Sequence, residues 1–419
     1  NPFIDFFSSK KEEESIYSSI SNIGIIDSNE ISTDKCLILR NQNQKVYKNR
    51  EFKFPIISYS KEGNIMRRGG NVNKFEIKIE EESKLNNKNQ SNNEWKIKDL
   101  KNGMYEVKME LKDEGKYLIF VQFNGIDIKS SPFQVEVFSK LKQRNYHEVN
   151  HPKLTFGSKG NKKGQFDGPS GITINSNGNI YVCDTSNSRI QIFDSEGNFI
   201  STFGLEGNEN GQFSCPFGIT INSKGNIIVS DTYNHRIQIF DSEGNFILTF
   251  GTKGKGNGQF HRPLGLAIDS SDNILICDNE NNRIQIFDSE GNFISRFGSK
   301  GDKNGQFNYP FGITINSKGN IIVSDTYNHR IQIFDSKGNF ISRFGSNGIG
   351  NGQFGNAYGV CVDLNENILV CDYINRIQIF NSEGEYMTQF KVKYPTNITI
   401  DPTTQNIIVC SDEHKISIY

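Results

Sequence analysis

The sequence predicts an all-β protein whose carboxy-terminal two thirds fold as a six-bladed β-propeller, preceded by a β-sandwich of about 100 residues. Three observations support this prediction: a 47-residue internal repeat, short Ile-, Val- and Phe-rich runs between turn-forming residues, and a composition with 39 Gly and 32 Phe against one Trp and four Met. That composition is typical of tight turns between short strands that each carry an aromatic anchor.

The repeat is marked by the dipeptide Gln-Phe, whose phenylalanines are Phe166, Phe213, Phe260, Phe307 and Phe354. A fixed period in this range indicates a repeat architecture. Each unit holds four short apolar runs separated by Gly-Asn, Asp-x-x-Asn or Ser-x-Gly, as an antiparallel four-stranded meander requires. One such sheet cannot bury both of its faces, so we expect the sheets to stack radially as propeller blades.

The ends of the repeat array predict how the ring closes. The sixth copy, from Tyr394 to Tyr419, stops after three strands, whereas the segment 153–157 matches the fourth strand of the other copies. We expect this segment to complete the last blade, because closure removes an exposed sheet edge. The propeller should therefore span residues 153–419.

A second repeated motif, Asp-x-x-Asn-x-Arg, occurs in four repeats, and the fifth carries a version one residue shorter. Two copies contain Asn-His-Arg, at 234–236 and 328–330. On these motifs, residues 153–419 resemble the NHL-repeat propellers, a family named for Asn-His-Leu in its consensus. Because the repeats share the Asp and Arg, we interpret them as structural loop pairs and not as partner contacts. The pairs are Asp184 with Arg189, Asp231 with Arg236, Asp278 with Arg283, Asp325 with Arg330, and Asp372 with Arg376.

The amino-terminal third has two parts. Residues 1–34 are polar and are interpreted as a linker or the end of an upstream helix. Residues 35–138 alternate as strands do, and the runs 102–107 (Asn-Gly-Met-Tyr-Glu-Val) and 131–135 (Ser-Pro-Phe-Gln-Val) resemble the filamin-type (ABP280) immunoglobulin-like repeat. Residues 139–152 are expected to link this sandwich to the propeller.

A filamin-type repeat followed by an NHL propeller resembles the carboxy-terminal half of TRIM-NHL proteins, in which RING, B-box and coiled-coil modules give ubiquitin ligase activity. This sequence holds none of these modules. We therefore expect no enzymatic activity of this chain itself, and oligomerisation only through upstream segments. The resemblance implies a protein-interaction scaffold that recruits a substrate or partner.

The expected docking surface is the face on which the second-to-third-strand loops and the blade-to-blade connections emerge together. Specificity should lie where the blades differ, and Tyr and Arg are favoured at interfaces. Phe217, Phe311 and Tyr358 follow the Pro step and either line the channel mouth or pack between blades. The predicted partner-binding residues are Tyr233, His235, His261, Arg262, Tyr309, Tyr327, His329, Asn356 and Tyr358.

The sequence indicates neither a metal site nor a cofactor. His235 and His329 lie in near-identical repeats with no third ligand beside them, and the first strands contain no carboxylate that could face the channel. The seven cysteines are an odd number without a C-x-x-C pair, which favours a reducing, cytoplasmic location. The apolar runs are too short to cross a membrane.

Single-stranded RNA is the alternative ligand, because some NHL propellers bind RNA on a basic face. From His151 to Tyr419 there are 22 Lys and Arg against 26 Asp and Glu, a net charge of −4, where a phosphate-binding surface should be basic. A local basic patch of Lys253, Lys255, His261 and Arg262 keeps this alternative open. A protein partner remains the first hypothesis.

Overall fold

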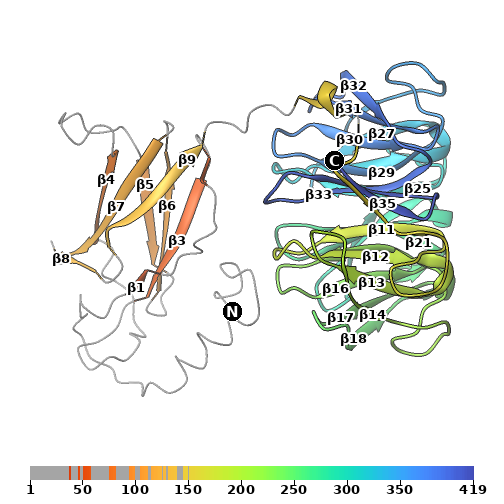
Figure 1. Cartoon of the computed structure of the whole chain (residues 1–419), viewed down its shortest axis with the longest axis horizontal. Coiled ribbons are helices and arrows are strands. Elements are labelled where there is room, and N and C mark those ends of the chain that lie inside the picture. The colour runs from red at the N-terminus through yellow and green to blue at the C-terminus, as the bar shows by residue number, and fades with distance from the viewer. Residues whose placement is uncertain are drawn as a thin grey trace. The chain divides into compact units, whose positions relative to one another are not determined.

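The computed structural model describes residues 37–38, 46–47, 51–57, 75–81, 94–99, 104–111, 115–124, 126–128, 131–138, 145–149 and 151–419. The chain divides into two compact units, 1–144 and 145–419 (Figure 1). The linker or helix end expected at 1–34 lies outside the described residues.

The first unit holds two β-sheets. One has the strand order β1-β3-β6-β5; the other has the order β2-β9-β7-β4, with β8 paired to β7. The strands are β1 (Leu37–Ile38), β2 (Val46–Tyr47), β3 (Glu51–Ile57), β4 (Phe75–Glu81), β5 (Glu94–Asp99), β6 (Met104–Glu110), β7 (Gly115–Phe123), β8 (Ile126–Asp127) and β9 (Phe133–Phe138).

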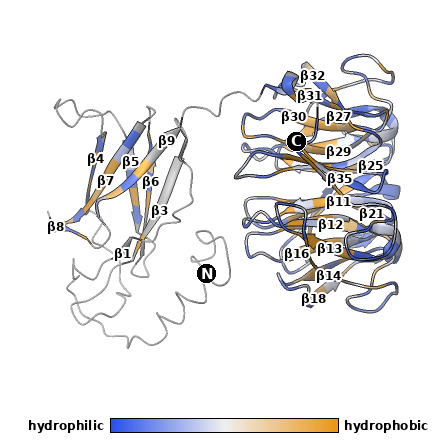
Figure 2. Ribbon diagram, viewed as in Figure 1, coloured by the Kyte–Doolittle hydropathy of each residue, from blue (hydrophilic) through white to orange (hydrophobic). Residues whose placement is uncertain are grey.

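The core of this unit lies between the sheets. Tyr105 and Val107 of β6, and Ile119 and Val121 of β7, are fully buried. Alternate residues of a strand share a face, so this spacing of two places all four side chains in one apolar layer. Figure 2 shows hydrophobic residues along the strands of both units, and the connecting loops of the second unit are mostly hydrophilic.

The second unit is the propeller, with six four-stranded sheets that we number as blades 1 to 6. Blade 1 comprises β11 (Pro169–Ile174), β12 (Ile180–Asp184), β13 (Arg189–Phe193) and β14 (Phe199–Phe203). Blade 2 comprises β15 (Pro216–Ile221), β16 (Ile227–Asp231), β17 (Arg236–Phe240) and β18 (Phe246–Phe250). Blade 3 comprises β21 (Pro263–Ile268), β22 (Ile274–Asp278), β23 (Arg283–Phe287) and β24 (Phe293–Phe297). Blade 4 comprises β25 (Pro310–Ile315), β26 (Ile321–Asp325), β27 (Arg330–Phe334) and β28 (Phe340–Phe344). Blade 5 comprises β29 (Ala357–Val362), β30 (Ile368–Asp372), β31 (Arg376–Phe380) and β32 (Tyr386–Lys391). Blade 6 comprises β33 (Pro395–Ile400), β34 (Ile407–Ser411), β35 (Lys415–Ile418) and β10 (Leu154–Phe156).

Short helical turns and one small sheet complete the loops. Two strands, β19 (Thr252–Lys253) and β20 (Gln259–Phe260), pair in parallel within the connection from blade 2 to blade 3. The 3-10 segments are η3 (Tyr146–Glu148), η4 (Thr185–Asn187), η5 (Thr232–Asn234), η6 (Asn279–Asn281) and η7 (Thr326–Asn328). Nothing helical in the described part of the chain has the length and hydropathy of a membrane span.

The repeated Gln-Phe phenylalanine anchors each connection between neighbouring blades. Phe213 is fully buried, with its ring centroid 5.4 Å from that of Phe240 in the same blade and 6.4 Å from that of Phe203 in the preceding blade. The equivalent Phe166, Phe260, Phe307 and Phe354 are also fully buried. We therefore expect truncation of such a side chain to weaken the packing of both blades that it contacts.

The first strand of each blade lines the central channel, and its glycine permits close approach to the next blade. A Cβ atom on Gly218 would collide with the carbonyl oxygen of Leu264 in blade 3. The hydroxyl of Ser230 bridges the same gap: it accepts the Gly218 N–H at 2.7 Å and donates to the Leu264 oxygen at 2.8 Å. Where other blades carry Cys at this position, as at Cys183 and Cys277, the side chain is also fully buried.

The ring is closed by β10, which is the outer strand of blade 6. It pairs antiparallel with β35, with Leu154 opposite Ile418 and Phe156 opposite Ile416. Part of the segment expected to be a linker (139–152) also packs on the propeller, because Tyr146 is buried and its hydroxyl donates to Asp363 Oδ2 at 2.6 Å. The compact unit therefore begins near residue 145.

Candidate functional site

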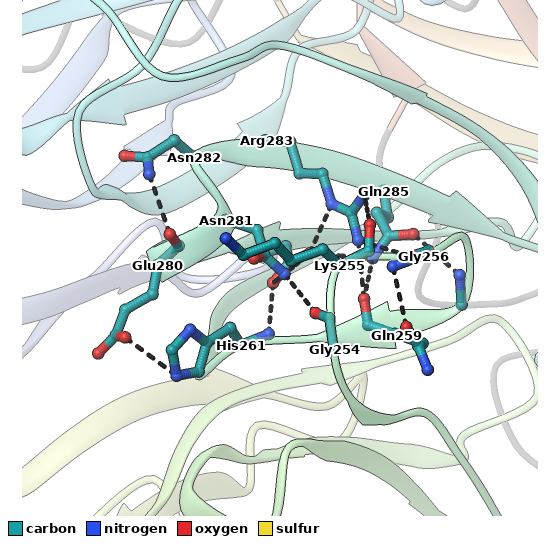
Figure 3. A network of polar contacts seen from close by, with 12 residues as sticks. Gly254, Lys255, Gly256, Gln259, His261, Glu280, Asn281, Asn282, Arg283 and Gln285 are labelled. Atoms are coloured by element: carbon teal, nitrogen blue, oxygen red, sulfur yellow. Dashed lines mark hydrogen bonds and ion pairs between the residues drawn. The ribbon is translucent and has the colours of Figure 1, made fainter.

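The Asp-x-x-Asn-x-Arg motif builds a buried polar network at one end of the blades, shown for blade 3 in Figure 3. Asp278 ends β22 and is fully buried. Its Oδ1 accepts the His261 main-chain N–H at 2.8 Å, while its Oδ2 accepts Arg283 Nε at 2.6 Å and Gln285 Nε2 at 3.1 Å. The other guanidinium nitrogens donate to the carbonyl oxygens of Lys255, Gly256 and Gln259.

The same ion pair is present in the first five blades. The N–O distances are 2.7 Å for Asp184–Arg189, 2.8 Å for Asp231–Arg236, 2.6 Å for Asp278–Arg283, 2.7 Å for Asp325–Arg330 and 2.8 Å for Asp372–Arg376. Each carboxylate is fully buried, and each also holds a main-chain N–H of the blade-to-blade connection. These side chains fix the loops of the face on which docking was expected, and their charges are paired with one another.

In blades 2 to 6, the residue before the arginine of this motif, or before Lys415 in blade 6, links its blade to the next one. It has a left-handed backbone, with φ of 57° at His235 and 54° at His329. The linking bonds run from the main-chain N–H of Arg262 to His235 Nδ1 (3.1 Å), of Tyr309 to Asn282 Oδ1 (2.9 Å), of Tyr394 to Asn375 Oδ1 (2.9 Å) and of Gly168 to His414 Nδ1 (3.1 Å).

Two of the three histidines predicted to bind a partner, His235 and His329, each use Nδ1 in a contact with the next blade. Nδ1 of His329 lies 2.6 Å from the carbonyl oxygen of Gly355 in blade 5. Burial lowers the pKa of His235, and the nearby cations Lys253, His261 and Arg262 lower it further. A neutral imidazole is the form whose Nδ1 can accept the Arg262 N–H. Among the described residues, no cluster of His, Cys, Asp or Glu could hold a metal ion.

Four residues that precede proline adopt an uncommon backbone conformation. Cys215, Arg262, Tyr309 and Tyr394 have φ between 42° and 57°. Steric clash makes this region uncommon for side chains larger than glycine, and it persists only where the surroundings impose it. The bonds from the preceding blade supply that constraint at Arg262, Tyr309 and Tyr394. Backbone strain of this kind is found at binding sites, which supports a functional reading of the face.

Four predicted partner residues meet between blades 2 and 3, in a group that we call the blade 2–3 cluster: Tyr233, His235, His261 and Arg262, together with Glu280. The guanidinium carbon of Arg262 lies 4.8 Å from the Tyr233 ring centroid. Glu280 accepts Arg262 Nη1 at 2.7 Å and lies 3.1 Å from His261 Nε2. The positive charge of Arg262 is therefore partly neutralised by an acid from the same loop set.

The other predicted aromatic residues lie over blades 4 and 5. Tyr309 and Tyr327 pair at 4.9 Å between ring centroids, and 54% of Tyr327 is exposed. Tyr358 stacks on Phe311 at 4.4 Å, and Phe311 meets Phe217 of blade 2 edge to face at 5.0 Å. These rings join side chains from three first strands, so they cover the channel mouth. Asn356, by contrast, is engaged in the loop network, with its N–H 3.3 Å from Asp372 Oδ1.

Two tyrosines that the sequence analysis did not select extend this group. Tyr373 lies 5.0 Å from Tyr358 and 5.5 Å from Tyr394 between ring centroids. The hydroxyl of Tyr373 donates to Asp412 Oδ2 at 2.6 Å, and this bond raises the tyrosine's pKa. The five rings form a continuous row from the channel mouth to blade 6, which we call the aromatic arc: Phe217, Phe311, Tyr358, Tyr373 and Tyr394.

Comparison with known families agrees with both halves of this architecture. The Filamin/ABP280 repeat model matches residues 32–134, and the NHL repeat model matches 166–193, 213–240, 260–287 and 307–334. The chain contains a filamin repeat followed by NHL repeats.

Curated relatives of this filamin–NHL chain include ubiquitin ligases. The E3 ubiquitin-protein ligase TRIM71 of Rattus norvegicus is 38% identical over 103 residues, which is 25% of this chain and 12% of the relative. Protein lin-41 of Caenorhabditis elegans is 38% identical over 102 residues, 24% of this chain and 9% of the relative. Protein brain tumor of Drosophila melanogaster is 54% identical over 44 residues, 10% of this chain and 4% of the relative. The matches thus cover a small part of each relative.

Solved structures similar to the filamin–NHL chain show the fold alone. A gluconolactonase from Xanthomonas campestris superimposes with a TM-score of 0.50 at 14% identity, covering 61% of this chain and 88% of its own. A protein of unknown function from Bacteroides thetaiotaomicron gives a TM-score of 0.50 at 12% identity, covering 94% of this chain and 100% of its own.

The channel of the NHL propeller is lined mainly by apolar and threonine side chains. A cavity of about 270 Å³ is lined by the first strands of the blades, with Thr173, Thr220, Thr314 and Thr399 among the side chains. Within residues 151–419, its lining includes no carboxylate, imidazole or ammonium group. The lining also includes the thiol of Cys361, and burial raises the pKa of this thiol.

Proposed function

We propose that the NHL propeller is a protein-binding scaffold and that its partner docks on the face formed by the blade 2–3 cluster, the Tyr309–Tyr327 pair and the aromatic arc. The observation that carries this proposal is the exposure of Tyr233 and Tyr327, 52% and 54%, on loops that are themselves fixed by buried ion pairs. Rigid aromatic and Arg side chains are the usual anchors of interfaces. The face offers such anchors on a scaffold that loses little entropy on binding.

The chain itself is proposed to recruit and not to catalyse. The relatives include E3 ubiquitin-protein ligases, and we propose that this chain is the substrate-recruiting region of a protein of that kind. The channel lining supports a non-catalytic role. We further propose a reducing, cytoplasmic location, because Cys183, Cys277, Cys371 and Cys410 are free, buried thiols.

Single-stranded RNA is the second candidate ligand. The basic patch expected from the sequence is only partly free: Arg262 and His261 both contact Glu280. Lys253 and Lys255 remain exposed on the connection from blade 2 to blade 3. RNA binding would fall steeply with salt, since it depends on the release of counterions from several phosphates.

Removing the anchors of this face should weaken partner binding while the fold persists. We expect each of Arg262→Ala, Tyr309→Ala and Tyr327→Ala to cost about 2 kcal/mol, which is roughly a thirtyfold loss of affinity. The measurement is quantitative pull-down of crosslinked partner from cell lysate at two salt concentrations. Circular dichroism checks the fold of each variant.

The matched control is Ile341→Ala, which truncates a side chain that is 50% exposed on the outer strand β28. It should leave the recovered partner unchanged. If the three face variants bind as the unaltered chain does, docking on this face is wrong and the outer rim or the filamin repeat becomes the site.

A further inference from the structure

An open cleft of about 690 Å³ lies between blades 3 and 4 on the docking face. It is bounded by the connection that enters blade 3, by the loop around η6 and by the chain that leaves β24. Its lining residues include Lys255, Glu280, Asn281, Arg296, Lys300 and Tyr309. Figure 3 shows Lys255, Glu280 and Asn281 in the same polar network as Arg283.

Three cations of this cleft are free to meet a ligand. Lys255, Arg296 and Lys300 are exposed, and none of them forms an ion pair with any described residue. The acid of the cleft is already engaged, because Glu280 contacts both Arg262 and His261. The cleft therefore carries a local excess of positive charge on a propeller whose net charge is −4.

The other blade junctions serve as internal comparisons, since the 47-residue repeat supplies equivalent positions. Between blades 2 and 3 these positions hold Asn208, Thr249 and Lys253. Between blades 4 and 5 they hold Asp302, Arg343 and Asn347. The first of these junctions has one cation, and the second has one cation and one acid. Of the three junctions compared, the one between blades 3 and 4 is therefore the one with three cations.

We propose that this cleft binds a phosphorylated side chain of the protein partner, an inference that rests on the proposed function and names the chemistry of its ligand. A phosphomonoester carries a charge of about −1.5 to −2 at neutral pH and three strong acceptor oxygens. Arg296 can pair with two of these oxygens, and Lys255 and Lys300 supply point charges. Asn281 also lines the cleft, and its buried Oδ1 accepts no hydrogen bond within the described residues.

The distribution of charge favours a phosphopeptide over RNA. An RNA strand places several phosphates along a track of cations, whereas the free cations here converge on one cleft. Tyr309 lines the cleft and pairs with Tyr327, so residues flanking the phosphorylated position would meet an exposed aromatic surface.

The test uses the full chain and two fluorescent peptide pools with degenerate flanks, one with central phosphoserine and one with central serine. Fluorescence anisotropy measures their affinities beside that of a 12-residue oligouridine. The cleft variant Lys255→Asn, Arg296→Thr, Lys300→Asn introduces residues that equivalent positions already carry. The control variant Lys224→Asn, Lys318→Asn, Arg343→Thr makes the same change of charge at exposed positions elsewhere on the propeller.

We expect the phosphoserine pool to bind at least tenfold more tightly than the serine pool, with this preference lost in the cleft variant and kept in the control. Equal binding of the two pools, or an undiminished preference in the cleft variant, overturns the inference. Loss of oligouridine binding in the cleft variant, without any preference for phosphoserine, assigns the cleft to RNA and also overturns it. Partner capture that survives in the cleft variant but fails in the Tyr309 and Tyr327 variants overturns the phosphate inference and leaves the proposed function standing.

Discussion

A chain that begins at Gly160 should fail to form a stable propeller, whereas a chain that begins at Asn145 should fold. The deletion removes β10, and with it the partners of Ile418 and Ile416 on β35 and the contact of Phe156 with Phe193, whose ring centroids are 4.9 Å apart. The loss of two apolar anchors and one strand amounts to several kcal/mol, against a stability of about 5–15 kcal/mol for a typical domain. The exposed edge of β35 would also promote aggregation.

Thermal unfolding followed by circular dichroism and light scattering checks this result. The chain from Asn145 is the matched control, because it keeps β10 together with the Tyr146–Asp363 hydrogen bond. A chain from Gly160 that stays monomeric and melts at the same temperature as this control would show that β10 does not close the ring.

Asp278→Ala should destabilise the propeller by about 3–5 kcal/mol, since it leaves a buried charge unpaired. The side chain of Arg283 is only 5% exposed, and without the carboxylate its guanidinium retains only carbonyl partners. The connection between blades 2 and 3 also loses the anchor of its His261 N–H. Urea-induced unfolding of the propeller measures the loss.

The matched control is Asp288→Ala, in the turn between β23 and β24 of the same blade. Asp288 also accepts main-chain N–H bonds, from Glu290 and Asn292, but it lies at the surface and forms no ion pair within the described residues. We expect a loss of about 1 kcal/mol or less there. Equal losses for the two variants would mean that burial of the Asp278–Arg283 pair contributes nothing.

The sequence was sufficient to predict the all-β architecture because the same motifs recur in most blades of the propeller. The Gln-Phe anchor, the Pro-x-Gly step and the Asp-x-x-Asn-x-Arg motif each have one physical role, and the 47-residue period shows that role several times over. The pairing of β10 with the sixth blade also followed from the period, because the sixth repeat has three strands and lacks its outer strand.

The candidate site was less predictable, because it depends on contacts between blades. Tyr373 was missed since the motif of blade 5 is one residue shorter, which moves the tyrosine out of register with Tyr327. His235 and His329 were predicted as partner contacts, but the bonds of their Nδ1 atoms to the next blade are not visible in a repeat alignment. The cleft was also not predicted, because Lys255 and Arg296 lie in different segments of one repeat and meet only in the folded structure.

The central claim, that a protein docks on the loop face of the propeller, is tested most directly by site-specific photo-crosslinking. Tyr327→p-benzoylphenylalanine places the probe on the docking face, and Lys318→p-benzoylphenylalanine places it in the turn between β25 and β26, at the opposite end of these strands. After irradiation in cell lysate and treatment with ribonuclease, we expect discrete protein adducts at position 327 and none at 318. Adducts that vanish with ribonuclease, or that form equally at both positions, would contradict the claim.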